Sequence, residues 1–189
     1  MFDGANTVVL FEELAFQDVL PVTWHPLPAP VDAETASVLA ERNVRLLQAR
    51  EAMDQLGPVE STDEDSPHAA ALIRLELKVN LVLDLVGQIL ASNHPRPAAV
   101  PIRFNSLGAT WRSPGTPLPE AGGVGLVEIY LHECLAEPLK LAARIASVTP
   151  DGHIKARFAP VGETVADLLE KLAFRRHRRL VAGSRQPTR

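Results

Sequence analysis

The side chains that could carry catalysis or hold a metal lie apart in this sequence. Neither the six histidines nor Cys134 stand at the spacing of a zinc site, and no C-x-x-C or H-x-x-x-H pair occurs. Ser106 lies in N-S-L-G, which differs from the G-x-S-x-G turn of a serine hydrolase. Gly122, Gly123 and Gly125 lead into an expected strand instead of a helix, so they do not form a phosphate-binding loop. We therefore expect no catalytic residue, no metal site and no enzyme.

The densest basic run is R-R-H-R-R at 175–179. Residues 171–189 hold seven bases and no acid, whereas residues 1–41 hold seven acids and no Lys or Arg. Such a tail can attract phosphate or pair with the acidic surface of its own chain. The four arginines spread around a helix at roughly 100° per residue, which favours a solvated helix end. We do not expect nucleic-acid binding, because Phe174 is the one aromatic residue nearby.

Composition and charge describe an ordinary globular chain. Of its 189 residues, 46% are apolar and 22% charged. One cysteine excludes an intrachain disulfide and fits a reducing compartment. The N-terminus lacks the basic residues of a secretion signal, and the most apolar helical stretch, 79–90, is too short to span a bilayer. These features predict a cytoplasmic protein without membrane insertion.

Two long helices are expected in the first half of the chain. Asp32 is a helix cap that opens a helix of about 25 residues, which Gly57-Pro58 ends. Ser66-Pro67 opens a second helix that reaches residue 92 or so. Its apolar residues recur at spacings of three and four, the coiled-coil period, in a seam made of Leu72, Leu75, Val79, Val82, Val86 and Ile89. Further apolar residues surround this helix, so one partner helix cannot cover it, and we predict that the seam assembles sister copies.

From residue 99 the apolar period changes to two. Short antiparallel strands with no helix between them are expected at 99–105, 108–113, 124–133, 139–148 and 153–159. Residues 20–25 add an edge strand, because Pro21 cannot donate to a central ladder. A last helix is expected at 163–181, and the strand pattern favours a small barrel or sandwich.

The second half of the chain resembles a PilZ domain over residues 98–181. The resemblance rests on VPIRFNSLGATW as early strands, VGLVEIYLHE and LKLAARIASV as middle strands, GHIKARFAPV as the closing strand, and the helix ADLLEKLAFRRHRRL. The helical part is similar to a xanthomonad-type variant in which a long heptad helix drives tetramer formation. The resemblance implies an α+β fold: a six-stranded antiparallel β-barrel with a long helical hairpin insertion and a C-terminal helix.

The chain would then divide into four parts. These are an N-terminal segment with the edge strand (1–31), a helical hairpin with the oligomerisation helix (32–95), the barrel with its C-terminal helix (96–182), and a basic tail (183–189).

The resemblance also indicates where a ligand would bind. PilZ domains bind cyclic di-GMP through Arg-x-x-x-Arg ahead of the barrel and Asp/Asn-x-Ser-x-x-Gly on an early strand. Alignment on Gly108 places Asn105 at the serine position and Arg103 at the acid position, and the segment before residue 99 offers only Arg96. Losing two or three charge-assisted contacts, each worth about 1.5–3 kcal/mol, weakens binding by roughly three powers of ten.

The resemblance therefore implies a bacterial, non-enzymatic scaffold or adaptor in cyclic di-GMP-linked control of motility or virulence. We expect a homo-oligomer, a tetramer by the resemblance, with an unidentified protein partner, no cofactor and no tight cyclic di-GMP binding. Two alternatives stay open: a receptor that binds cyclic di-GMP through Arg103 and the tail arginines, and a nucleic-acid binder that uses 171–189.

Overall fold

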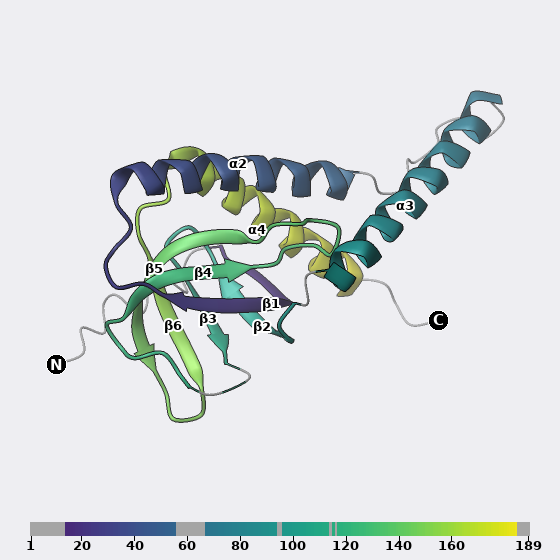
Figure 1. Cartoon of the computed structure of the whole chain (residues 1–189). Helices are drawn as coiled ribbons and strands as arrows, with labels where there is room; N and C mark the ends of the chain where they lie inside the picture. Colours follow the sequence, from purple (N-terminus) through teal and green to yellow (C-terminus); the bar gives the residue numbers. More distant parts are fainter. Residues whose placement is uncertain (1–13, 56–66, 94–95, 114, 116, 185–189) are drawn as a thin grey trace.

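The computed structural model describes residues 14–55, 67–93, 96–113, 115 and 117–184. Its centre is a closed antiparallel barrel of six strands in the order β1-β2-β3-β6-β5-β4. Figure 1 shows helices α2 and α4 side by side over one end of the barrel, and α3 pointing away from it. The expected α+β class with a six-stranded antiparallel barrel is confirmed.

The strands fall close to the predicted segments. They are β1 (Phe16–Pro26), β2 (Ala99–Phe104), β3 (Gly108–Arg112), β4 (Val124–Ile129), β5 (Leu139–Val148) and β6 (His153–Phe158). Alternate residues enter the core, as in β5, where Leu139, Leu141 and Ile145 are buried while Arg144 is exposed. This period of two fixes which side chains face outward, where a ligand can reach them.

The expectation of an edge strand at 20–25 is wrong, because β1 lies between β2 and β4 in the closed barrel. Phe16 to Pro21 pair with β2, and Val22 to Pro26 pair with β4. Pro21 stands at the change from one partner to the other, where its missing N–H costs the ladder little. A proline therefore fits in a strand that both of its neighbours cover.

Helix α2 (Ala33–Gln55) begins at the predicted cap. The Thr35 N–H donates to Asp32 Oδ1 over 2.8 Å. The helix packs on α4 (Glu163–Ser184) and on β5, and buries Leu47 and Asn43. Gly57 and Pro58, the expected stop signal, lie outside the described residues.

Helix α4 closes one end of the barrel. It buries Val165, Leu169, Leu172 and Ala173, which stand four, seven and eight residues from the first and so share one face. These residues belong to the same buried core as the inward side chains of the strands.

Helix α3 (Pro67–Asn93) diverges from α2 instead of lying along it, so the two helices of the expected hairpin splay apart (Figure 1). Its partners within the chain are therefore few along most of its length. Among the described residues, no helix is long and apolar enough to cross a membrane.

Candidate functional site

The motif residues Arg103, Asn105 and Gly108 lie in the β2–β3 hairpin, but Asn105 serves the turn. Its Oδ1 accepts the N–H groups of Leu107 and Gly108 over 2.9 and 3.2 Å, and its own N–H donates to the Gly108 carbonyl over 3.0 Å. Asn105 is 5% exposed, and its Nδ2 finds no partner in the described part of the chain. Arg103 points outward from β2 and is partly exposed. Arg103 is thus partly exposed at this hairpin, whereas the Asn105 side chain is buried.

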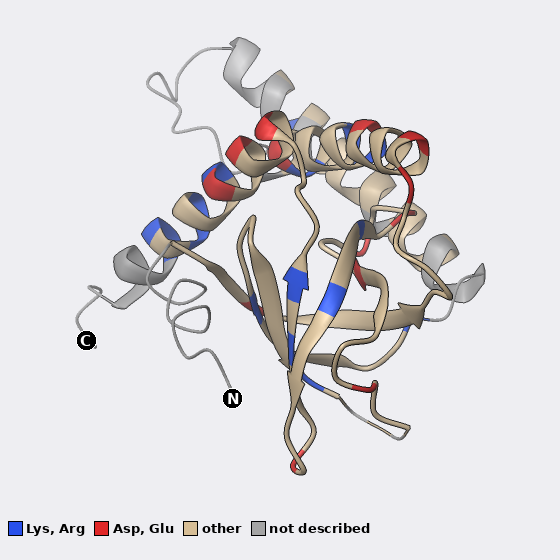
Figure 2. Cartoon of the chain, turned by 90° about the vertical axis from the view of Figure 1, so that its left-hand side faces the viewer, with Lys and Arg blue, Asp and Glu red and all other residues tan. Residues whose placement is uncertain are grey.

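Bases predominate on four strands of the barrel. Strands β2, β3, β5 and β6 contain no Asp or Glu, and their bases are Arg103, Arg112, Lys140, Arg144, Lys155 and Arg157. Figure 2 shows Lys and Arg along the strands of the barrel. Across the ladders Arg103 shares a row with Thr110 and Lys155, and Gly108 shares a row with Arg157. We call the six bases together the basic barrel face.

Sequence reasoning does not connect Lys155 and Arg157 of β6 with the motif residues Arg103 and Gly108. The register between β3 and β6 brings them together, and no spacing along the chain reveals it. The charge bias of four whole strands is the signal that could have found this face.

The oligomerisation seam predicted on α3 is uncovered in the single chain. The seam side chains that the structure describes are Leu75, Val79, Val82, Val86 and Ile89, and their exposed fractions lie between 38% and 60%. Leu72 belongs to α3, but its side chain lies outside the described residues. Leu77, Leu81 and Leu85, elsewhere on the helix, are exposed as well. The α3 seam, as we call these six residues, therefore lacks cover from its own chain over the part described.

Helix α3 contacts the barrel body through a glycine. Gly87 is buried, and a Cβ added there would lie 3.4 Å from Cys134 Sγ. The Cys134 thiol donates to the Leu83 carbonyl over 3.1 Å. The absent side chain at Gly87 lets the β4–β5 loop approach the helix backbone, which helps to set the direction in which α3 projects.

Arg96, the one arginine just ahead of β2, is engaged by the same loop. Its guanidinium donates to the carbonyls of His132, Glu133 and Leu135 over 3.1, 2.9 and 2.8 Å. It also lies 5.3 Å from the centre of the Tyr130 ring, a cation–π contact. Arg96 therefore anchors the loop against the base of α3, and its planar fork is occupied by carbonyl oxygens.

Most of this chain matches the model of a known domain family. A model of the atypical PilZ domain, described as a cyclic di-GMP receptor, matches residues 47–186, a span that includes α3, strands β2 to β6 and α4. The chain belongs to the atypical PilZ domain family. Strand β1, which completes the barrel, lies ahead of the matched span.

A solved structure extends the likeness of this PilZ domain to nearly the whole chain. It is that of a pathogenic protein from Xanthomonas campestris, described as a new tetrameric PilZ domain self-assembled via an unusual helical bundle. The two align with a TM-score of 0.69 and 28% identity over 96% of this chain and 98% of that chain. No curated protein matches. The resemblance predicted from the sequence, to PilZ domains and to this tetrameric variant, is confirmed.

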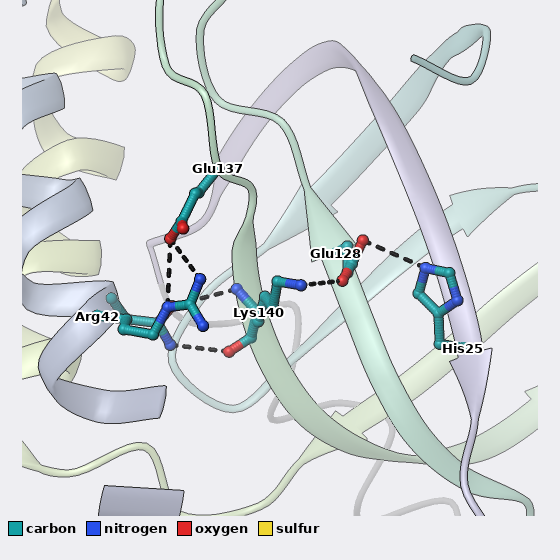
Figure 3. A network of polar contacts seen from close by, with 6 residues as sticks. His25, Arg42, Glu128, Glu137 and Lys140 are labelled. Carbon is teal, nitrogen blue, oxygen red and sulfur yellow. Dashed lines mark hydrogen bonds and ion pairs between the residues drawn. The ribbon is translucent and has the colours of Figure 1, made fainter. Parts of the chain in front are cut away.

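A polar network crosses the outside of this PilZ barrel (Figure 3). Glu128, 8% exposed, accepts Lys140 Nζ over 2.6 Å and lies 3.2 Å from His25 Nε2. Arg42 of α2 pairs with Glu137 over 2.6 Å and holds the pKa of that carboxyl below its ordinary value. The network ties β1, β4 and β5 together and α2 to the loop before β5. Its acids are neutralised by neighbours, which indicates a structural role.

The arginines of α4 also serve the PilZ fold. Arg175 pairs with Glu51 of α2, and Arg176 donates to Asp18 of β1 over 2.8 Å. The basic run at 175–179 thus pairs partly with acids of its own chain, one of the two uses expected from its charge. Within the described residues, no three His, Cys, Asp or Glu side chains are grouped as a metal site would need.

Proposed function

We propose that this atypical PilZ domain is a non-enzymatic scaffold or adaptor that forms a homotetramer through α3. It would act in cyclic di-GMP-linked control of motility or virulence by presenting its barrels to an unidentified protein partner. The observation that carries the proposal is the exposed α3 seam. Contiguous exposed apolar surface of this kind marks an interaction site, and spacings of three and four suit a left-handed bundle. The tetrameric helical bundle of the Xanthomonas campestris protein supports the number of subunits.

The proposal includes a barrel that does not bind cyclic di-GMP tightly. Asn105 is committed to the hairpin turn, and Arg96 donates to three carbonyls of the β4–β5 loop. A nucleotide would have to break these bonds before it gained new ones, and each broken bond to a charged group costs about 1.5–3 kcal/mol. Titration calorimetry that gave a sub-micromolar dissociation constant would contradict this part.

Assembly is tested by placing a charge in the α3 seam. Val82→Glu puts a carboxylate where four helices would meet, so we expect light scattering to report a monomer in place of a tetramer. Val38→Glu on α2 is the matched control, because Val38 is 51% exposed and Val82 56%. A wild-type monomer at micromolar concentration, or a Val82→Glu tetramer, would refute assembly by the seam.

A second candidate function is a cyclic di-GMP receptor that uses the basic barrel face. The absence of acids from four strands around Gly108 favours it, because a cyclic dinucleotide with two negatively charged phosphodiesters gains from such a field. Titration of wild type against Arg103→Ala tests it, with Arg112→Ala as the control on the same face. A loss of about tenfold or more confined to Arg103→Ala would support the receptor.

A further inference from the structure

A cavity of about 350 Å³ lies between the segment that enters α2 and the outer face of β4, β5 and β6. Pro30, Val31 and Ala36 form one wall. Ala142 and Ala146 of β5 form much of the other. Alanines stand here at outward positions of a strand where larger β-branched residues would fill the space, so the hollow is a consequence of their small size.

Two arginines border this apolar cavity. Arg144 of β5 and Arg157 of β6 are direct partners across the strand pair, and both are exposed. The two residues stand directly opposite one another, so a carboxylate placed between them can contact both guanidinium groups. None of the residues that line the cavity carries a carboxylate. Asp32, the nearest acid along the entering segment, accepts the Thr35 N–H as the helix cap.

The Arg144 side chain is held in place at this border. Its Nη1 donates to the Gly122 carbonyl over 2.8 Å, which fixes the guanidinium beside the cavity. A guanidinium has five N–H groups, so one bond to a carbonyl leaves others for a carboxylate. An anchored planar fork loses less freedom when it binds an anion than a mobile side chain does.

We propose that this cavity binds a small aliphatic carboxylate, with its chain between the apolar walls and its carboxylate at Arg144 and Arg157. At roughly the 30 Å³ that a water molecule occupies in the liquid, the volume suits about ten to twelve non-hydrogen atoms, the size of octanoate or decanoate. Apart from the two arginines, the described residues that line the walls are apolar, so the edges of a nucleotide base would stay unpaired there. The site lies on the barrel and does not depend on assembly through α3.

Chain length and charge can be varied separately to test the site. We expect calorimetry on the full chain, below micelle-forming concentrations, to show affinity rising about fourfold per methylene from hexanoate to decanoate and then levelling off. The affinity should level off because longer chains would extend beyond the cavity. 1-Octanol, with the same chain and no charge, should bind at least about tenfold more weakly than octanoate. Equal affinity for the two would overturn the assignment of the arginines.

Substitutions at the lining residues test where the carboxylate binds. Arg144→Gln should lower octanoate affinity about tenfold, whereas Arg112→Gln, on β3 and away from the lining residues, should leave it unchanged. Ala142→Leu fills the cavity and should abolish binding without lowering the melting temperature by more than a few degrees. If that variant does not fold, Ala146→Leu fills the same wall from an exposed position. Wild-type affinity in the folded variant would place the carboxylate elsewhere, for example on α3, and overturn the proposal.

Discussion

Asn105 stands where the family's ligand motif has a serine, and its amide oxygen accepts two backbone N–H groups of the hairpin turn. Asparagine is well suited to this, because its short side chain reaches backbone groups two and three residues ahead. Asn105 is 5% exposed, so its side chain stabilises the turn and does not face the surface where a ligand would bind. In this chain the Asn105 side chain therefore stabilises the hairpin turn.

Replacing Asn105 tests this structural role. We expect Asn105→Ala to lower the free energy of unfolding by about 1–3 kcal/mol, because the N–H groups of Leu107 and Gly108 lose their shared acceptor in a buried turn. Ser106→Ala next to it is the control and should change stability by less than about 0.5 kcal/mol. Denaturant unfolding measures both, and equal effects of the two changes would refute the assignment.

At the scale of elements, the start of α2 gives a pH prediction. The Thr35 N–H that donates to Asp32 Oδ1 lowers the pKa of that carboxyl below its ordinary value of 3.8. A carboxyl whose pKa is lower in the folded state stabilises the fold above its unfolded pKa, and this stabilisation disappears as pH falls through the folded pKa. Asp32→Ala should therefore melt below wild type at about pH 7, and the difference should close toward about pH 3.

The Asp32→Asn variant separates the capping hydrogen bond from the charge of the carboxylate. Asp32→Asn keeps an acceptor for the Thr35 N–H and does not titrate, so its melting temperature relative to Asp32→Ala should stay constant over the same pH range. A pH-independent gap between wild type and Asp32→Ala would contradict the prediction.

We expect Gly87 to help set the direction of α3. Gly87→Ala should be tolerated, since its Cβ would lie 3.4 Å from Cys134 Sγ, and alanine favours a helix by about 0.8–1 kcal/mol over glycine. Gly87→Leu should force α3 away from the β4–β5 loop, because the larger side chain would occupy the space of Cys134 and Glu133. The melting temperature and the solution mass should be measured for both variants. A Gly87→Leu protein that matched Gly87→Ala in both would show that this contact does not set the helix direction.

At the scale of the whole molecule, bases near the end of the chain pair with acids in its first third. Arg176, near the C-terminus, binds Asp18 of β1, and Arg175 binds Glu51 of α2. Both pairs are partly exposed, so each stabilises the fold modestly. Their effect is to hold α4 against the strand and the helix that it covers.

A double-mutant cycle measures this connection. Asp18→Asn, Arg176→Gln and the double variant should give a coupling free energy of about 0.2–1 kcal/mol, which shrinks as salt screens the charges. Glu41 and Arg45 form the control cycle, because they stand four residues apart on exposed α2 and should couple no more strongly than about 0.5 kcal/mol. A zero coupling between Asp18 and Arg176 at low salt would remove this pair from the account of how α4 is held.

The sequence alone determined the strands and helices to within a few residues, together with the apolar seam on α3. These features follow from local periodicity and from caps such as Asp32. Pairing between distant segments does not follow from local sequence. Closure of the barrel around Pro21, the row that joins Gly108 to Arg157, and the diversion of Asn105 into a turn were decided by tertiary contacts. The sequence could show that α3 has too much apolar surface for one partner helix. Only the folded chain could show that α2 does not cover it, since α2 instead buries Leu47 against α4 and β5.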